Sequence, residues 1–401
     1  MRAVPPGGPA AYGRGGAFRD RGAHLARFES VGLSGDGGVI VDEARCTVFV
    51  ASSGPFANLA ADLQLLEVWG DPPSPHKDGP RFAWHDFNRG RFPRHGEVAE
   101  PRRVQEAASV VGFASASHFH ALTEVLGRLL LLAQHGPLAE RGVQLVAPRD
   151  PGGSEGFISA ALRLLAREAV EQERVIWWDR GGPPDVRLRV GTLHYASWSP
   201  PAGLGEDGGH CATPRTVLVG VRATLLAALR PPPPAGGSGS GEAAAAVAPP
   251  PPTPALVLIS RPRGGMRSHL AGWATLRKGL TGAAVAARPV PLLLEDFDGG
   301  LGPAATAALF VRARAVVGVH GGALANMIFC GGSTEIFEVG FSTPFAGHYR
   351  HLAAALGLRL TLLPLAADER GLGAQEVHLA EPESAVRAIR ARLGRPRRDD
   401  E

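Results

Sequence analysis

The stretch AVVGVHGGALANMIFC, residues Ala315 to Cys330, decides how the second half of the chain is expected to fold. It begins as a short apolar run, which predicts a buried strand. His320, Gly321 and Gly322 separate that run from a second apolar segment, ALANMIF, which predicts the start of a helix. We therefore expect a tight turn at the carboxyl end of a strand, where open α/β sheets bind their ligands.

The residues of this turn suit an anion. Glycine lets backbone approach a ligand closely, and a helix N-terminus offers N–H groups and a partial positive charge that favour phosphate. His320 can donate a hydrogen bond to the anion or to a sugar hydroxyl. Asn326, further into the helix, could hold the turn or touch the ligand. A purely structural interpretation, a glycine turn with a hydrogen-bonded histidine, explains the same residues.

Strand and helix patterns alternate on both sides of this stretch. In the C-terminal half, apolar strands such as ALVLIS, STEIFEVG and RLTLLPL are separated by amphipathic helices such as WATLRKGL and ESAVRAIRARLG. This alternation is typical of βαβ units around a buried parallel sheet. The sequence therefore predicts an α/β protein.

Composition divides the chain into four predicted segments. Residues 1–35 are polar and glycine-rich, and we expect them to be poorly ordered. Residues 36–230 are predicted to form an N-terminal α/β domain. The low-complexity segment 231–254 cannot bury a core and is predicted to be a flexible linker. Residues 255–395 are predicted to form a C-terminal Rossmann-like domain. A length of 401 residues is enough for two such domains.

Charge, cysteine and hydropathy patterns argue against several classes of protein. A net charge of +4 suits anionic ligands, but there is no interleaved basic and aromatic platform, so we expect no nucleic-acid partner. The three cysteines lack a CxxC spacing, which predicts neither a zinc site nor a disulfide framework. No apolar run approaches the ~20 residues that span a bilayer, so no signal segment or membrane anchor is expected in this sequence.

A second candidate site lies in the segment LVLISRPRGGMRSHL. A predicted strand ends at Ser260 and is followed by three arginines, Arg261, Arg263 and Arg267, with two glycines between them. A guanidinium stays charged and can bind two oxygens at once, which suits a pyrophosphate. An ordinary basic loop explains the same residues.

A third candidate site lies on a helix that is predicted to begin near Ser117. His120, Glu124 and Arg128 fall four residues apart, so they share one stripe of that helix. A carboxylate beside an imidazole can act as a general base or hold one in place. The structural interpretation is a solvated helix face with an ion pair.

Acidic residues at two predicted strand ends are further candidates. Glu338 could accept hydrogen bonds from ribose hydroxyls at the sheet edge, or pair with a nearby arginine. Asp296 and Asp298 have the Asp-x-Asp spacing with which metal-dependent sugar transferases hold a divalent cation. We expect these two aspartates to lie instead in an exposed loop, and we predict no metal site.

The order of these motifs resembles glycosyltransferase family 61. SHFHALTEVLGRLLLL is similar to the helix that opens that family's catalytic region, and LISRPRGGMR is similar to its Ile-Ser-Arg segment. ALFVRARAVVGVHGGALANMIFCGGSTEIFEVG resembles its most specific signature, and HYRHLAAALGL fits the helix that follows. The resemblance covers roughly residues 105–365.

This resemblance implies a GT-B-like fold, in which two Rossmann-like domains face each other across a cleft. It implies an inverting, metal-independent transfer of a sugar from a UDP-sugar to a hydroxyl of a glycan or glycoprotein, with no cofactor. Members include plant cell-wall xylosyl- and arabinosyltransferases and protein O-linked GlcNAc transferases. Most are anchored proteins of the Golgi or the endoplasmic reticulum, which is the location that the resemblance implies.

In the implied mechanism, the UDP-sugar donor binds to the C-terminal half. Arg261, Arg267 and the turn over residues 320–322 would stabilise the charge that develops on the leaving diphosphate, and Glu338 would help to hold the nucleoside.

The base that takes the acceptor's proton would come from the N-terminal half, with Glu124 as the first choice and His120 as the second. The alternatives are a catalytically inactive glycan- or nucleotide-binding homologue and a metal-dependent transferase that uses Asp296 and Asp298.

Overall fold

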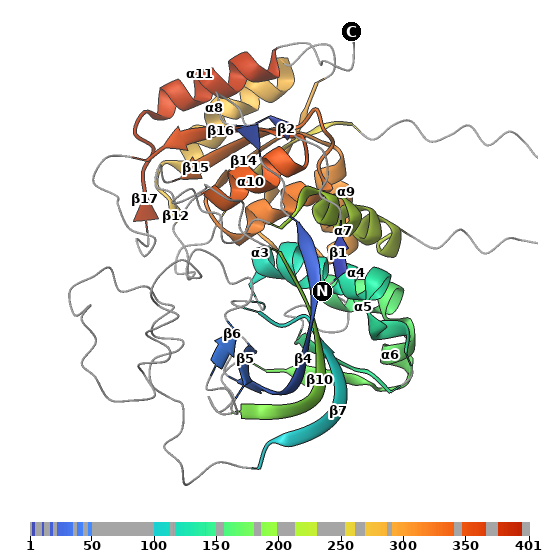
Figure 1. Cartoon of the computed structure of the whole chain (residues 1–401). Coiled ribbons are helices and arrows are strands. Elements are labelled where there is room, and N and C mark those ends of the chain that lie inside the picture. Colours follow the sequence, from blue (N-terminus) through green and yellow to red (C-terminus); the bar gives the residue numbers. More distant parts are fainter. Residues whose placement is uncertain are drawn as a thin grey trace, which may run out of the picture. The chain divides into compact units, whose positions relative to one another are not determined.

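The computed structural model of the chain divides it into two compact units. The first unit comprises Met1–Thr224 and Thr343–Gly357, and the second comprises Leu225–Ser342 and Leu358–Glu401 (Figure 1). The structure describes residues 2–4, 10–11, 17–18, 22–34, 38–42, 47–49, 100–112, 115, 117–140, 142–149, 156–179, 186–198, 213–230, 253–260, 269–286, 291–340, 347–365 and 376–394.

A five-stranded parallel sheet forms the centre of the second unit. Its strands are β11 (Ala255–Ile259), β13 (Leu293–Phe297), β14 (Ala313–Val319), β15 (Glu335–Gly340) and β16 (Arg359–Pro364). They lie in the order β13-β11-β14-β15-β16, and every neighbouring pair is parallel. Numbered along the chain, this is the order 2-1-3-4-5 of a doubly wound sheet.

Helices cover both faces of this sheet because its central strands are apolar on both sides. Helices α8 (Trp273–Ala286) and α11 (Pro382–Leu393) lie side by side in Figure 1 and pack on the face that carries Leu258, Val317 and Phe337. On the opposite face, α9 (Pro303–Val311) stacks its Phe310 edge-on against Phe297 of β13. The small strands β12 (His269–Leu270) and β17 (Glu376–Val377) pair with each other.

The strand order of the second unit reverses between β11 and β14. The connections that leave these two strands run in opposite directions along the sheet, and such a reversal opens a crevice at the carboxyl ends of the strands. Ser260 is the residue that follows β11, and His320 is the residue that follows β14. The two motifs predicted to bind a diphosphate therefore begin at the same point of the same sheet.

Close packing of β14 against β11 depends on a glycine. Gly318 lies in register with Ile259 on one side and with Glu338 on the other. A Cβ atom at position 318 would lie 2.9 Å from the Cβ of Ile259, which is closer than real side chains approach.

We expect the substitution Gly318→Ala to lower the free energy of unfolding of the second unit by about 1–3 kcal/mol, because the extra methyl group overpacks the sheet. Urea titration followed by circular dichroism measures this change. Gly331→Ala is the matched control, since a Cβ there meets nothing within 4 Å. An equal effect of the two substitutions would contradict the packing argument.

The first unit contains a mixed sheet. Its main strands are β4 (Ala23–Ser34), β5 (Val39–Asp42), β6 (Thr47–Phe49), β7 (Arg102–Ser109), β8 (Gln144–Pro148), β9 (Val175–Trp178) and β10 (Val186–Trp198). They lie in the order β6-β5-β4-β10-β7-β8-β9, and β1 (Arg2–Val4) pairs with β4. The part β10-β7-β8-β9 is parallel, and the remaining pairs are antiparallel. A small antiparallel pair, β2 (Ala10–Ala11) with β3 (Ala17–Phe18), is separate.

The parallel part of the first sheet has its own reversal point. Strands β8 and β9 follow β7 on one side, whereas β10 pairs with β7 on the other side. The helices of this unit are α3 (His118–His120), η2 (Ala121–Val125), α4 (Leu126–His135), η3 (Pro137–Ala139), α5 (Phe157–Leu165), α6 (Arg167–Glu171), α7 (Arg215–Ala228) and α10 (Gly347–Ala355). The first three follow β7 directly, so they begin at the reversal point.

The predicted α/β class, with a Rossmann-like α/β sheet in each of the two units, is confirmed. The predicted poor order of residues 1–35 is wrong for β4, which pairs with β10 along most of its length. The predicted boundaries also differ, because α10 follows β15 along the chain but belongs to the first unit. The predicted linker lies almost entirely outside the described residues, and no described helix is long and apolar enough to cross a bilayer.

Candidate functional site

The turn after β14 is built as the sequence predicts. Gly321 has φ of 150° and ψ of 173°, a conformation that is open to glycine and strained for any residue with a side chain. The helix that follows, η6 (Gly322–Phe329), is a 3₁₀-helix and not the expected α-helix. Its first two residues, Gly322 and Ala323, are partly exposed, whereas the next seven residues are buried.

His320 is held by a buried carboxylate. Its Nδ1 lies 2.5 Å from Oε1 of Glu338, which is fully buried on the neighbouring strand β15. Glu338 faces the same side of the sheet as Gly318, and a Cβ at Gly340 would come within 3.2 Å of that same Oε1 atom. The side chain of Glu338 therefore lies in space that Gly340 leaves open.

Protonation of the pair follows from the chemistry of its members. A carboxylate only accepts hydrogen bonds, so Nδ1 of His320 is the donor, and the ring presents Nε2 to other partners. The second oxygen of Glu338, Oε2, is also buried and has no hydrogen-bond partner among the described residues. A buried carboxylate oxygen normally has a donor, and a hydroxyl of a bound molecule is one such donor.

The other residues predicted for this site have different positions. Asn326 is buried, and its Nδ2 donates to the carbonyl of Ala323, so it holds the turn of η6. Arg261 and Arg267 lie outside the described residues, although Ser260, which precedes them, ends the adjacent strand. The side chain of Asp296 pairs with Arg277 at 2.8 Å.

Asp298 also has a structural partner, because its Oδ1 accepts a hydrogen bond from the backbone of Gly300. In the part of the chain that the structure describes, no three His, Cys, Asp or Glu side chains form a group that could hold a metal ion. Asp296 lies within β13 and Asp298 directly follows it, so the prediction that both aspartates lie in an exposed loop is wrong for Asp296.

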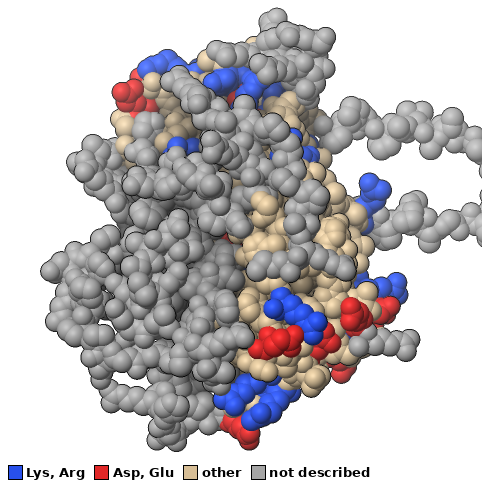
Figure 2. All heavy atoms as spheres, in the orientation of Figure 1, with Lys and Arg blue, Asp and Glu red and all other residues tan. Residues whose placement is uncertain are grey.

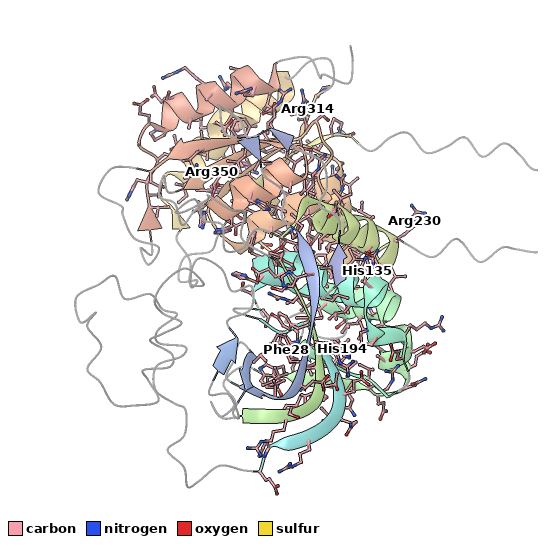
Figure 3. The ribbon with its side chains drawn as sticks, viewed as in Figure 1. Phe28, His135, His194, Arg230, Arg314 and Arg350 are labelled. Carbon is pink, nitrogen blue, oxygen red and sulfur yellow. The ribbon has the colours of Figure 1, made fainter. Side chains whose placement is uncertain are left out.

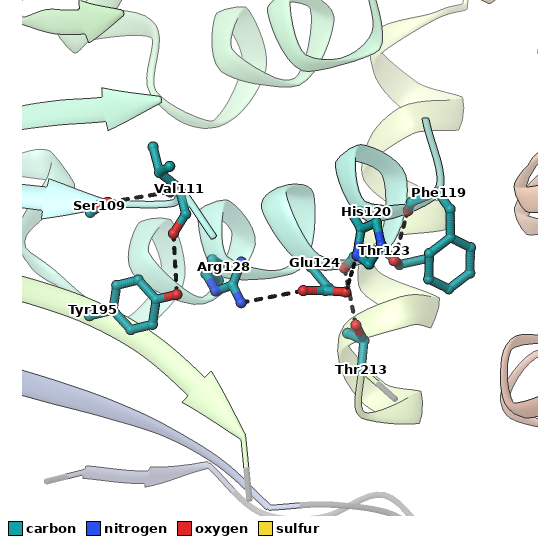
Figure 4. Close-up of polar contacts among 9 residues, drawn as sticks. All are labelled: Ser109, Val111, Phe119, His120, Thr123, Glu124, Arg128, Tyr195 and Thr213. Carbon is teal, nitrogen blue, oxygen red and sulfur yellow. Dashed lines mark hydrogen bonds and ion pairs between the residues drawn. The ribbon is translucent and has the colours of Figure 1, made fainter. Parts of the chain in front are cut away.

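The polar stripe of the first unit is buried. Figure 4 shows His120, Glu124 and Arg128 in one chain of contacts along the helices that follow β7. Nδ1 of His120 lies 2.6 Å from Oε1 of Glu124, and NH2 of Arg128 lies 3.5 Å from Oε2. The side chains of Glu124 and Arg128 are only 2% and 1% exposed, while that of His120 is 14% exposed. The solvated helix face offered by the structural interpretation is therefore wrong.

The guanidinium of Arg128 lies near the ends of β7 and β10, the two strands between which the strand order of the first sheet reverses. Its guanidinium carbon lies 5.2 Å from the ring centres of both Tyr195 and Trp198, which come from the end of β10. These cation–π contacts stabilise the charge inside the protein. Gly112, just after β7, provides the room, because a Cβ there would lie 2.7 Å from NH1 of Arg128. The hydroxyl of Tyr195 donates to the carbonyl of Val111 and fixes the ring (Figure 4).

The helix that carries this stripe contains a π-helical segment, η2, which includes Glu124. Short π-helical segments are rare and occur often at functional sites. Two threonines hold the segment: Thr123 donates to the carbonyl of Phe119, and Thr213 donates to the carbonyl of Thr123. His351 of α10 lies 2.8 Å from the carbonyl of Thr213, so α10 supports the same corner.

Two further polar pairs of the first unit have more exposed carboxylates. Arg149 follows β8 and pairs with Asp179, which follows β9; the hydrogen bond and charge of Asp179 raise the pKa of Arg149. His194 of β10, labelled in Figure 3, lies 2.7 Å from Glu106 of β7, and that glutamate is 36% exposed. This pair lies in the middle of the strands and not at their carboxyl ends.

Several residues of these sites carried no sequence signal. Tyr195 and Trp198 lie on a strand whose pairing with β7 brings them to Arg128, and no local pattern predicts that pairing. Thr213 lies ninety positions from Thr123, and His351 is further still. The glycines at 112 and 340 could have been noted, but their use depends on the neighbours that the fold supplies.

Comparison with known proteins adds no assignment. No protein-family model matches the chain, and no curated protein matches it. The resemblance to glycosyltransferase family 61 therefore stays a hypothesis that depends on the quoted motifs and on the geometry of the two sites.

Proposed function

We propose that the protein is an inverting glycosyltransferase that moves a sugar from a UDP-sugar to a hydroxyl of a glycan or glycoprotein. The observation that carries this proposal is the position of two motifs in the second unit. The arginine-rich segment and the turn at His320 begin at the carboxyl ends of β11 and β14, the two strands between which the strand order reverses. Doubly wound sheets bind nucleotides at this point.

The chemistry of this corner suits a nucleoside diphosphate. The start of η6 directs backbone N–H groups at the ligand, and glycine at position 321 lets the backbone approach it. Arg261 and Arg267, which follow β11 along the chain, would supply positive charge. Oε2 of Glu338 has the remaining acceptor capacity to bind a ribose hydroxyl, while its Oε1 holds His320.

The other groups needed for transfer come from the first unit. An acceptor hydroxyl must lose its proton as it attacks, and the pair of His120 and Glu124 is a general-base candidate at the reversal point of that sheet. No protein cofactor is part of the proposal, and the partners are the nucleotide-sugar donor and the glycan or glycoprotein acceptor.

Three alternatives have less support. A metal-dependent transferase would use Asp296 and Asp298, but both side chains have protein partners in the described structure. A nucleic-acid-binding protein would need a continuous basic surface. On the part of the face in Figure 2 that is not grey, acidic and basic side chains are interspersed. Exposed ion pairs such as Arg27 with Glu29 also occur among the described residues. An inactive nucleotide-binding homologue would bind UDP without turnover.

The test is calorimetric titration of the wild-type protein with UDP, GDP and CMP in buffer that contains EDTA. We expect UDP to bind best, and we expect Arg261→Ala to weaken UDP binding by about ten- to a hundred-fold, since a charge-assisted hydrogen bond contributes about 1.5–3 kcal/mol. Arg387→Ala is the control, because that side chain is 70% exposed on α11. Absence of UDP binding would overturn the proposal, and binding that requires Mn²⁺ would favour the metal-dependent alternative.

A further inference from the structure

We propose that His120 is the general base of the transfer reaction, and that Glu124 and Arg128 are buried positioning residues that prepare it. This inference depends on the proposed function. It also reverses the order expected from sequence, in which Glu124 was the first choice of base.

The hydrogen bond between His120 and Glu124 fixes the form of the imidazole ring. Oxygens of a carboxylate can only accept, so the proton in the 2.6 Å contact belongs to Nδ1 of His120. In the neutral ring the lone pair is then on Nε2, which is the nitrogen that can take a proton from a substrate. Glu124 therefore selects the tautomer in which His120 is a base.

The side chains of His120 and Glu124 differ in solvent exposure, which indicates different roles. The side chain of Glu124 is 2% exposed and contacts a residue on each side, His120 and Arg128. The side chain of His120 is 14% exposed, so it is the member of the chain that reaches the surface. A group that removes a proton from an acceptor must be accessible to it, and His120 has the most exposed side chain of these three residues.

Arg128 keeps Glu124 in the state that this role requires. A guanidinium remains charged at all relevant pH values, and its NH2 lies 3.5 Å from Oε2 of Glu124. The positive charge favours the ionised carboxylate in a buried position, where a lone carboxylate would be costly. Tyr195 and Trp198 hold the guanidinium between β10 and the helix, so the carboxylate has a fixed anchor.

The base and its carboxylate lie at the start of the π-helical segment. His120 directly precedes η2 and Glu124 lies within it, four residues later. Nδ1 of His120 and Oε1 of Glu124 face each other at 2.6 Å. Hydrogen bonds from Thr123 and Thr213 stabilise this local geometry.

In the proposed step, the acceptor's proton goes to His120 and the electron pair of the broken bond goes to UDP. The acceptor oxygen forms a bond to the anomeric carbon as its proton moves to Nε2 of His120, and the bond from that carbon to the UDP oxygen breaks with its electron pair leaving on UDP. The imidazolium so formed is stabilised by the carboxylate of Glu124. His120 then releases the proton to solvent, and the sugar is transferred with inversion.

Azide distinguishes a base from a donor-binding residue, because azide attacks carbon without losing a proton. We would incubate the wild-type, His120→Ala and His320→Ala proteins with a UDP-sugar and with methyl glycosides as acceptors. The donors are UDP-N-acetylglucosamine, UDP-xylose and UDP-glucose. The readouts are the rate of UDP release and the amount of glycosyl product. We expect His120→Ala to lower transfer to hydroxyls by about 10²–10⁴-fold. Added azide should restore UDP release and yield a glycosyl azide in this variant but not in His320→Ala.

Three further variants separate positioning from folding. Glu124→Gln should lower kcat with little change in the KM for the UDP-sugar. The double variant His120→Ala/Glu124→Gln should be no slower than His120→Ala, because the rate losses caused by substituting residues that act together do not add. His194→Ala removes a similar histidine from a His–Glu pair away from the strand ends, and should keep normal transfer.

The outcomes separate this inference from the proposed function. If the wild-type protein releases UDP but His120→Ala transfers sugar to hydroxyls at the wild-type rate, or gains nothing from azide, His120 is not the base. If the rate losses of the two single variants add up in the double variant, Glu124 does not act together with His120. If the wild-type protein binds no UDP and turns over no UDP-sugar, the proposed function itself fails.

Discussion

Replacing Arg128 with methionine is expected to lower the free energy of unfolding by about 3–5 kcal/mol, since removal of one partner from a buried ion pair leaves the other charge without compensation. The charge left behind is that of Glu124, which is 2% exposed and keeps only its contact with His120 among the pairs described above. Loss of the cation–π contacts to Tyr195 and Trp198 adds to the effect. Urea titration followed by circular dichroism measures the change.

The double variant Glu124→Met/Arg128→Met tests the cause. Replacing both members of a buried ion pair by apolar residues of similar size is often neutral or stabilising, so we expect the double variant to regain most of the stability that Arg128→Met loses. Arg167→Met is the matched surface control: that guanidinium is 76% exposed beside Glu171, and we expect no measurable change. A double variant as unstable as the single variant would show that packing, and not charge, makes Arg128 important.

Replacing His320 with alanine is expected to lower kcat by about 10²–10³-fold, which is the usual effect of removing one preorganised donor from the charge that develops in a transition state. The donor here is the ring of His320, at the corner where the diphosphate is proposed to lie. Because Nδ1 already donates to Glu338, this role requires a second proton on Nε2. Because that charge grows only as the bond to UDP breaks, the affinity for the intact UDP-sugar should fall much less than kcat. Steady-state rates of UDP release and calorimetry on the same preparation give the two numbers.

Two variants control this experiment. His378→Ala removes an exposed histidine of the same unit and should leave both numbers unchanged. Glu338→Gln keeps the shape of the side chain but loses the charge that orients the ring, so its kcat should lie between those of the wild type and His320→Ala. Equal kcat values for His320→Ala and the wild type would leave the turn with a structural role only.

The second unit shows how much local sequence can predict. Apolar runs of strand length, separated by amphipathic helices, predict a parallel sheet, and the glycine turn at the end of one run predicts where a ligand would bind. The four strands predicted above for this half have counterparts in β11, β14, β15 and β16, and the turn at His320 lies at a carboxyl end of a strand. The form of the following helix was not predictable, since a 3₁₀-helix of eight residues has no distinctive periodicity in so apolar a segment.

The first unit shows where such prediction ends. The spacing of His120, Glu124 and Arg128 correctly placed them on one stripe, yet the same spacing describes a solvated face and a buried one. Burial was decided by β10, which brings Tyr195 and Trp198 beside the helix from more than sixty positions away. Residues 23–34 belong to a segment whose polar, glycine-rich composition predicts poor order, but pairing with β10 stabilises them as one long strand.

The sequence by itself therefore determined the class of fold, the turn at His320 and the stripe that contains His120, because each depends on residues that are close along the chain. The tertiary structure decided the order of the strands, the partnership of His320 with Glu338, the burial of Arg128 and the membership of α10 in the first unit. These features depend on which strands become neighbours and which faces of them meet. Hydrophobic periodicity shows that a face will be buried, but not which distant segment will cover it.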